Sequence, residues 1–89
     1  MVSEVKKISF LLSCSDNVLN VTITNLKEQA LVLNEIDIHI VQNKWENKKI
    51  AIPNRVILIE EKNEILLPIA SGTQLIMIQV ENVQTFFEI

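Results

Sequence analysis

The stretch that decides the fold is residues 18–40, VLNVTITN-LKEQA-LVLNEIDIHI, in which a polar turn separates two alternating segments. In the first segment every second residue from Leu19 to Ile23 is apolar, and in the second the same holds from Ile36 to Ile40. A period of two places apolar side chains on one face of a β-strand and polar side chains on the other. The stretch therefore predicts two strands, each with one buried face.

The same alternation continues on both sides of this stretch, in residues 8–14, 65–69 and 76–80. Turn-forming residues recur at spacings of about 8–14 residues, which is typical of short antiparallel strands in a two-sheet fold. The predicted fold is all-β, an immunoglobulin-like antiparallel β-sandwich of about seven to eight strands, with residues 1–89 as a single domain. We expect strands over residues 3–14, 18–25, 30–41, 48–52, 55–60, 64–69, 74–82 and 84–89.

The main alternative fold is a small closed barrel of the OB type. Tight barrels bend their strands at glycines. This chain contains one glycine in 89 residues, and the sandwich is therefore favoured over the barrel.

The alternation breaks at two places. Apolar residues are odd-numbered over 31–33 and even-numbered over 36–40. If both sets face the core, residues 34–35 must hold a bulge or a crossing from one sheet to the other. The same change of parity across residues 6–7 predicts a feature of the same kind.

The residue inventory argues against chemistry at an active site. The chain has one His, one Cys and one Gly, and its formal net charge is −3. One His and one Cys cannot complete a tetrahedral zinc site, and a single Gly cannot make a phosphate-binding loop. The alternation places His39 on the outer face of its strand. We predict no enzymatic activity, no cofactor and no metal site.

The alternative function is nucleic-acid binding by a small β-barrel protein. Single-strand binders interleave basic and aromatic side chains on one surface. One cluster has this character, and we take it as the alternative nucleic-acid contact: Lys44, Trp45, Lys48 and Lys49. The acidic balance of 8 basic against 11 acidic residues makes this the weaker hypothesis.

Several segments are more apolar than one buried sheet face requires. Residues 56–59 are apolar at every position, and two phenylalanines are adjacent near the C-terminus. Neighbouring residues of a strand point to opposite faces, so some of these side chains must lie outside the core. Exposed apolar patches mark partner surfaces. We predict a protein interface drawn from Val56, Ile57, Leu58, Ile59, Phe86 and Phe87.

The strand pattern resembles a known class of module. Residues 19–40 are similar to strands B and C of immunoglobulin-like and fibronectin-type modules. Residues 65–80 resemble strands E and F, where a turn of small residues joins two alternating segments. Modules of this kind occur in archaeal surface-appendage proteins, including archaellum accessory proteins and pilins. The resemblance implies an immunoglobulin-like fold and a structural role in an archaeal appendage, or in a virus.

The expected function is that of a non-catalytic protein-interaction or assembly module. Its expected partner is protein, either further copies of itself in a homo-oligomer or a larger assembly, and no small-molecule substrate is expected. No stretch approaches the roughly 20 apolar residues of a membrane span. A chain that starts natively at Met1 is expected in the cytoplasm, and a fragment of an anchored protein is expected outside it.

Overall fold

A computed structural model describes residues 2–42 and 46–89, and the regular secondary structure of this part of the chain consists of strands and one short 3₁₀ turn. No helix among the described residues is long and apolar enough to cross a bilayer. The strands are β1 (Val2–Val5), β2 (Ile8–Ser15), β3 (Val18–Asn25), β4 (Leu31–Val32), β5 (Ile36–Val41), β6 (Asn47–Ile50), β7 (Val56–Ile57), β8 (Lys62–Pro68), β9 (Leu75–Val80) and β10 (Val83–Glu88).

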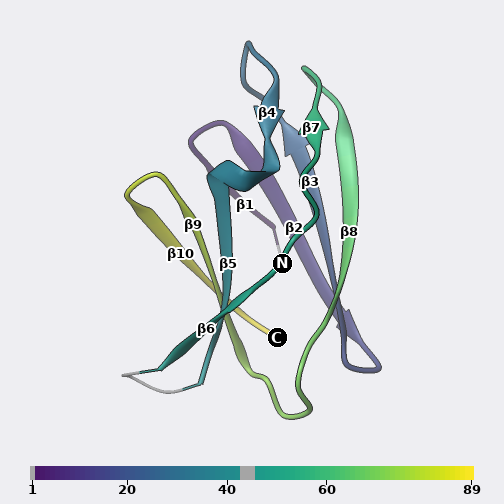
Figure 1. The fold of residues 1–89 in the computed structure, drawn as a ribbon, viewed down its shortest axis with the longest axis vertical. Helices are drawn as coiled ribbons and strands as arrows, with labels where there is room; N and C mark the ends of the chain where they lie inside the picture. Colours follow the sequence, from purple (N-terminus) through teal and green to yellow (C-terminus); the bar gives the residue numbers. More distant parts are fainter. Residues whose placement is uncertain (1, 43–45) are drawn as a thin grey trace.

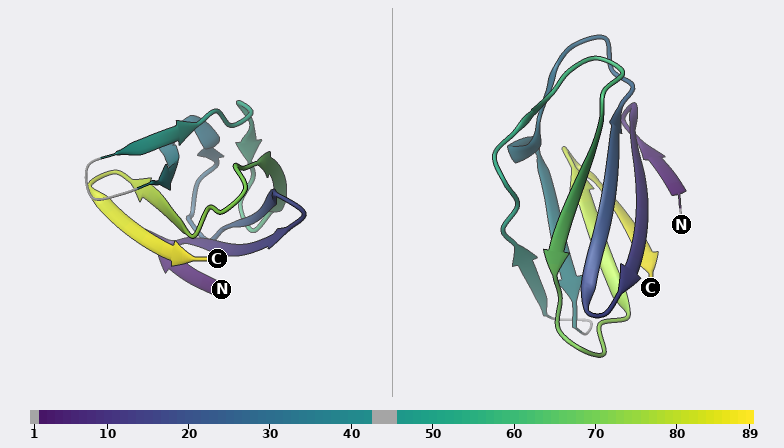
Figure 2. Two further views of the ribbon diagram at one scale, coloured as in Figure 1. Left: turned by 90° about the horizontal axis from the view of Figure 1, so that it is seen from below. Right: turned by 90° about the vertical axis from the view of Figure 1, so that its right-hand side faces the viewer.

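The strands form two four-stranded sheets and one small sheet, and every pair is antiparallel. The strand order is β1-β2-β3-β8 in the first sheet and β10-β9-β5-β6 in the second, and β4 pairs with β7. The two larger sheets lie face to face as two layers (Figures 1 and 2). The prediction of an all-β, antiparallel fold is confirmed. The strand count differs, because the described residues form ten strands in three sheets rather than seven or eight in a sandwich.

One extra strand arises at the N-terminus, where residues 3–14 were expected to form a single strand. Lys6 and Lys7 have φ of 52° and 61°, and Val5 pairs with Ile8 across them. Positive φ at both central residues is the geometry of the tight two-residue hairpin turn. The expectation of a bulge or sheet crossing at residues 6–7 is therefore wrong, because the chain reverses there into a hairpin.

The second break of alternation is a crossing between sheets, which is one of the two alternatives that the sequence left open. β4 belongs to the small sheet, a single 3₁₀ turn over Leu33–Glu35 follows, and β5 then enters the second large sheet. The turn shifts the parity of the chain, so Leu31 and Leu33 face the core together with Ile36. Residues 30–41 consequently form two strands instead of one.

The core lies between the two large sheets and takes side chains from both. Its members alternate along each strand as the period of two requires. Burial of each large aliphatic or aromatic side chain contributes about 1.5–3 kcal/mol, so this single cluster stabilises the domain. The core cluster consists of Val5, Ile8, Phe10, Leu12, Leu19, Val21, Ile23, Leu31, Leu33, Ile36, Ile38, Ile40, Ile57, Ile65, Leu67, Ile69, Ile76, Ile78, Val80 and Phe87.

The adjacent phenylalanines of β10 provide a matched test of this core. Phe87 is fully buried, whereas Phe86 is 54% exposed on the outer face of the same strand. We expect Phe87→Ala to lower the free energy of unfolding by about 3–5 kcal/mol and Phe86→Ala to lower it by less than about 1 kcal/mol. Urea unfolding at low protein concentration measures both values, and equal losses would contradict the assignment of faces.

Candidate interaction surfaces

The predicted interface segment 56–59 is only partly exposed. Val56 and Ile57 form the short strand β7 and alternate, so Val56 is exposed and Ile57 is buried in the core. The strand ends at Ile57, and alternation no longer applies beyond it. Leu58 and Ile59 both point outward and are 62% and 55% exposed.

The loop that carries Leu58 and Ile59 is held in place by the side chain of Asn25. Asn25 is fully buried and is the one buried polar residue in the described part of the chain. Its Nδ2 donates to the backbone oxygens of Ile57 at 3.0 Å, Leu58 at 3.3 Å and Gln29 at 2.9 Å. Its Oδ1 accepts a hydrogen bond from the backbone N–H of Lys27 at 2.9 Å. One amide group thus joins the loop after β3 to the segment after β7.

Backbone hydrogen bonds reinforce this junction. The N–H of Asn25 donates to the oxygen of Glu61 at 3.1 Å, and the N–H of Glu60 donates to the oxygen of Asn25 at 3.0 Å. Both loops lie at the same end of the molecule, beyond β4 and β7 (Figure 1). Leu26, on the first loop, is also exposed. We call the exposed residues of these two loops and of β7 the apolar tip: Leu26, Val56, Leu58 and Ile59.

Phe86 lies on the outer face of the second sheet, in a row of side chains that crosses four strands. Phe86 is opposite Met77 on β9, Met77 is opposite His39 on β5, and His39 is opposite Lys49 on β6. Met77 is buried although it lies outside the core cluster. The neighbours of Met77 in this row therefore cover an apolar side chain on the outside of the sheet.

His39 is half-buried on this outer face, the face on which the sequence placed it. Its Nδ1 is buried and has no hydrogen-bond partner among the described residues. The same part of the chain contains no group of three His, Cys, Asp or Glu side chains that could hold a metal ion. His39 therefore lies between Met77 and Lys49 in this row, outside any such cluster of the described residues.

The free edge of β10 is a second surface, made of backbone groups. The N–H of Ile89 donates to the oxygen of Gln74 at 3.0 Å, in line with the register that pairs Phe87 with Ile76. In an antiparallel ladder, alternate residues direct their N–H and C=O groups to the same neighbour. The odd-numbered residues of β10 therefore bond to β9. The remaining groups, on Gln84, Phe86 and Glu88, face the open edge of the sheet.

The alternative nucleic-acid cluster is described only in part, since Lys44 and Trp45 lie outside the described residues. Lys48 and Lys49 are exposed on the edge strand β6. As neighbours on a strand they point to opposite sides. The Nζ of Lys49 lies 3.0 Å from Oδ1 of Asp37, so this lysine is paired with a carboxylate. These two lysines do not form one basic patch.

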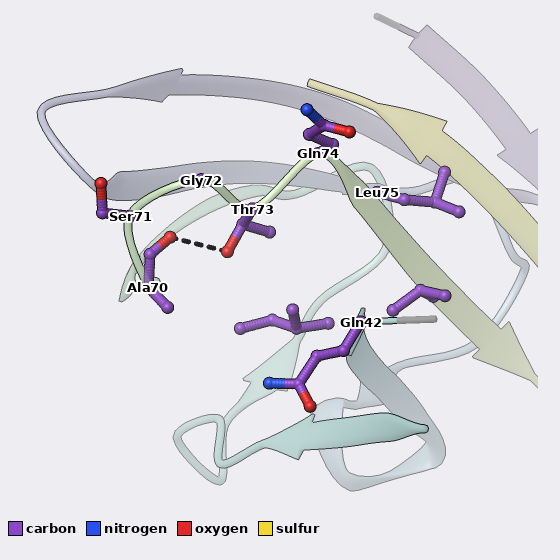
Figure 3. Close-up of a pocket in the computed structure, with 9 residues that line it drawn as sticks. Gln42, Ala70, Ser71, Gly72, Thr73, Gln74 and Leu75 are labelled. Carbon is purple, nitrogen blue, oxygen red and sulfur yellow. Dashed lines mark hydrogen bonds between the residues drawn. The ribbon is translucent and has the colours of Figure 1, made fainter. Parts of the chain in front are cut away.

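An open hollow of about 610 Å³ lies at the end of the molecule opposite the apolar tip. Figure 3 shows the turn that forms one wall, in which Thr73 Oγ1 donates to the oxygen of Ala70 at 2.7 Å. Gly72 adopts φ of 83°, a conformation that side chains rarely tolerate. The polar groups of the wall are neutral, among them Ser71 and Gln42. Among the described residues, the hollow therefore brings together no acid, base or cation.

Sequence reasoning missed Leu26 as a member of the apolar tip and Asn25 as the buried residue that holds the tip in place. Both lie where the sequence changes from an alternating strand to a polar turn, and asparagine is common in such turns. The signal that could have identified Asn25 is its parity, because it continues the inward series of Leu19, Val21 and Ile23. A polar side chain at a core-facing position must form hydrogen bonds within the protein. Here the side-chain N–H groups donate to loop carbonyls.

The described surface offers apolar side chains and free backbone groups rather than a converging set of reactive groups. Comparisons with known protein families, curated proteins and solved structures find no match for this chain. The apolar tip and the β10 edge are therefore the two candidate functional surfaces.

Replacing Asn25 tests how the apolar tip is held. We expect Asn25→Ala to lower the free energy of unfolding by about 1–3 kcal/mol, because it leaves buried backbone groups without partners. Hydrogen exchange should accelerate in residues 26–30 and 57–61 more than elsewhere. Asn63→Ala, which removes one exposed bond from Arg55, is the control, with an expected change of about 0.5 kcal/mol or less. Equal losses in both variants would contradict the role of Asn25.

Proposed function

We propose that this chain is a non-catalytic assembly module whose partner is protein, in the first place further copies of itself. The observation that supports this best is the amount of large apolar surface outside the core. Leu58, Ile59 and Phe86 are each more than half exposed, in a domain of 89 residues. Burying such side chains between two molecules is favourable by about 1.5–3 kcal/mol for each one fully covered.

The way these residues are held also supports the proposal. The apolar tip is fixed by the bonds of Asn25, and Phe86 lies within a regular ladder. A surface that is already ordered loses little conformational entropy when it binds. Both surfaces are therefore suited to recognition without a change of fold.

The proposed fold type is an immunoglobulin-like or fibronectin-type sandwich. Its support is the strand order, in which β2-β3-β8 faces β10-β9-β5-β6 and the chain crosses between the sheets after β4. On this proposal β1, β4 and β7 are short additions to a seven-stranded arrangement. The setting we propose is a larger protein assembly such as a surface appendage or a virus particle, on the strength of the resemblance in strand pattern.

Solution mass over a concentration series tests the proposed function. We expect the wild-type chain to exceed the monomer mass of 10.2 kDa as concentration rises. Lysine at an interface residue should return the mass to that of the monomer, because charge is costly to bury without a partner. The variants are Phe86→Lys on the β10 edge and Leu58→Lys with Ile59→Lys on the apolar tip. Ile57→Lys is unsuitable, since Ile57 belongs to the core.

Leu66→Lys is the matched control. Leu66 is 64% exposed on the outer face of the other sheet, away from both proposed surfaces. The control should keep the wild-type mass, while at least one interface variant becomes monomeric. A wild-type chain that stays monomeric at every concentration would contradict the proposed function.

A further inference from the structure

We propose that two copies of this chain pair through their β10 strands, antiparallel about a two-fold axis at Phe86, and join their second sheets into one continuous sheet. This inference rests on the proposed function and names the surface and the register of the contact. A two-fold contact uses the same patch on both copies. The partner strand is therefore the residue 83–88 segment of a second molecule.

The first support is that the other edges of the two large sheets are protected. β1 has four residues. The open side of β8 carries Lys62 and Glu64 and ends at Pro68, which has no N–H to donate. β6 is also four residues long and carries two lysines. Short strands, charged side chains and proline are the features that prevent edge pairing.

The edge of β10 lacks these protections. The strand has six residues without proline or lysine, and its one charge, Glu88, lies at its end. Gln84, Phe86 and Glu88 direct backbone N–H and C=O groups away from β9, and no backbone hydrogen bond to another described strand joins this edge. A free row of donors and acceptors at a sheet edge is a template for another strand.

The register follows from two requirements. Side chains on one face of the joined sheet must come from the same face of each copy, and the free backbone groups must meet each other. Pairing Phe86 with Phe86 meets both requirements, because it places Gln84 opposite Glu88 on each side of the axis. Every free backbone group of these three residues then has a partner.

The side chains agree with this register. The two Phe86 rings face each other on the outer face, and aromatic cross-strand pairs are favourable. Glu88 meets the neutral Gln84 rather than the Glu88 of the other copy, so no like charges are opposed. The β1–β2 turn lies near the β9–β10 turn, as the Lys6 Nζ to Glu81 Oε2 distance of 3.7 Å shows. In the described part of the chain, β10 has a ladder partner only on its β9 side, so the other side of Gln84 to Glu88 stays open.

Charge substitutions at Gln84 test the register. Gln84→Lys would place a lysine opposite Glu88 of the other copy, whereas Gln84→Glu would oppose two carboxylates. Each contact occurs twice by symmetry. We expect the dimer dissociation constant to fall roughly twofold to tenfold in Gln84→Lys and to rise by a similar factor in Gln84→Glu. Both shifts should shrink at high salt. Identical dissociation constants for the two variants would overturn the register.

Proline tests the pairing of the edge itself. Gln84→Pro removes an N–H that points away from β9, so the monomer should stay folded by circular dichroism while the dimer is lost. The control is Lys49→Pro on β6, the opposite edge of the same sheet. The Gln42 N–H to Glu46 oxygen bond places the N–H of Lys49 on the outward side of β6, and this variant should keep the dimer.

The outcomes separate the two proposals. A dimer that persists in Gln84→Pro but is lost when Leu58 and Ile59 become lysine would overturn the β10 contact and leave the assembly function standing. A wild-type chain that is monomeric at all concentrations overturns both. If Gln84→Pro is unfolded, the two charge variants at Gln84 decide the matter.

Discussion

Every strand has two faces, but each large sheet of this domain packs only one of its faces against the core. This constraint governs the rest of the structure. It divides the apolar residues into those buried in the core and those left on the outer faces of the sheets. The neighbours Phe86 and Phe87 show this division most directly. Phe87 belongs to the core cluster, so Phe86 must lie on the outside. The side chain of Phe86 therefore adds little to the core and leaves apolar surface exposed to solvent.

The same constraint explains why Asn25 matters. It continues the inward series of β3 but is polar, so it requires hydrogen-bond partners inside the protein. The carbonyls of Ile57 and Leu58 supply them, together with that of Gln29. The outcome is a fixed loop pair whose apolar side chains face away from the core. A buried polar group thus determines the shape of an exposed apolar surface.

Much of the fold could be predicted from the sequence because alternation is a local signal. The strands β3 and β5 follow from alternation. The parity change before Ile36 predicts a bulge or a crossing, and the structure has the crossing. The hairpin at Lys6 and Lys7 could not be predicted, because lysine is not a residue that favours positive φ. The end of the alternation between Ile57 and Leu58 could not be predicted either. Where β7 ends is set by contacts with β4, which no short window of sequence reveals.

The candidate surfaces were harder to predict than the core. The parity argument required one outward member in each adjacent pair, but it could not tell whether a loop covers Phe86 or which edge stays open. Those facts depend on the order of strands in the sheet, which places β10 at an edge beside β9 alone.

Amide hydrogen exchange of β10 at two protein concentrations tests the central claim, edge-to-edge assembly, most directly. The amides of Gln84, Phe86 and Glu88 face the open edge, and those of Thr85 and Phe87 are internal references that bond to β9. The account predicts that the first set exchanges rapidly in dilute solution and becomes protected as concentration rises, while the references change little. Rapid exchange of Phe86 at every concentration, in a sample of dimer mass, would contradict it.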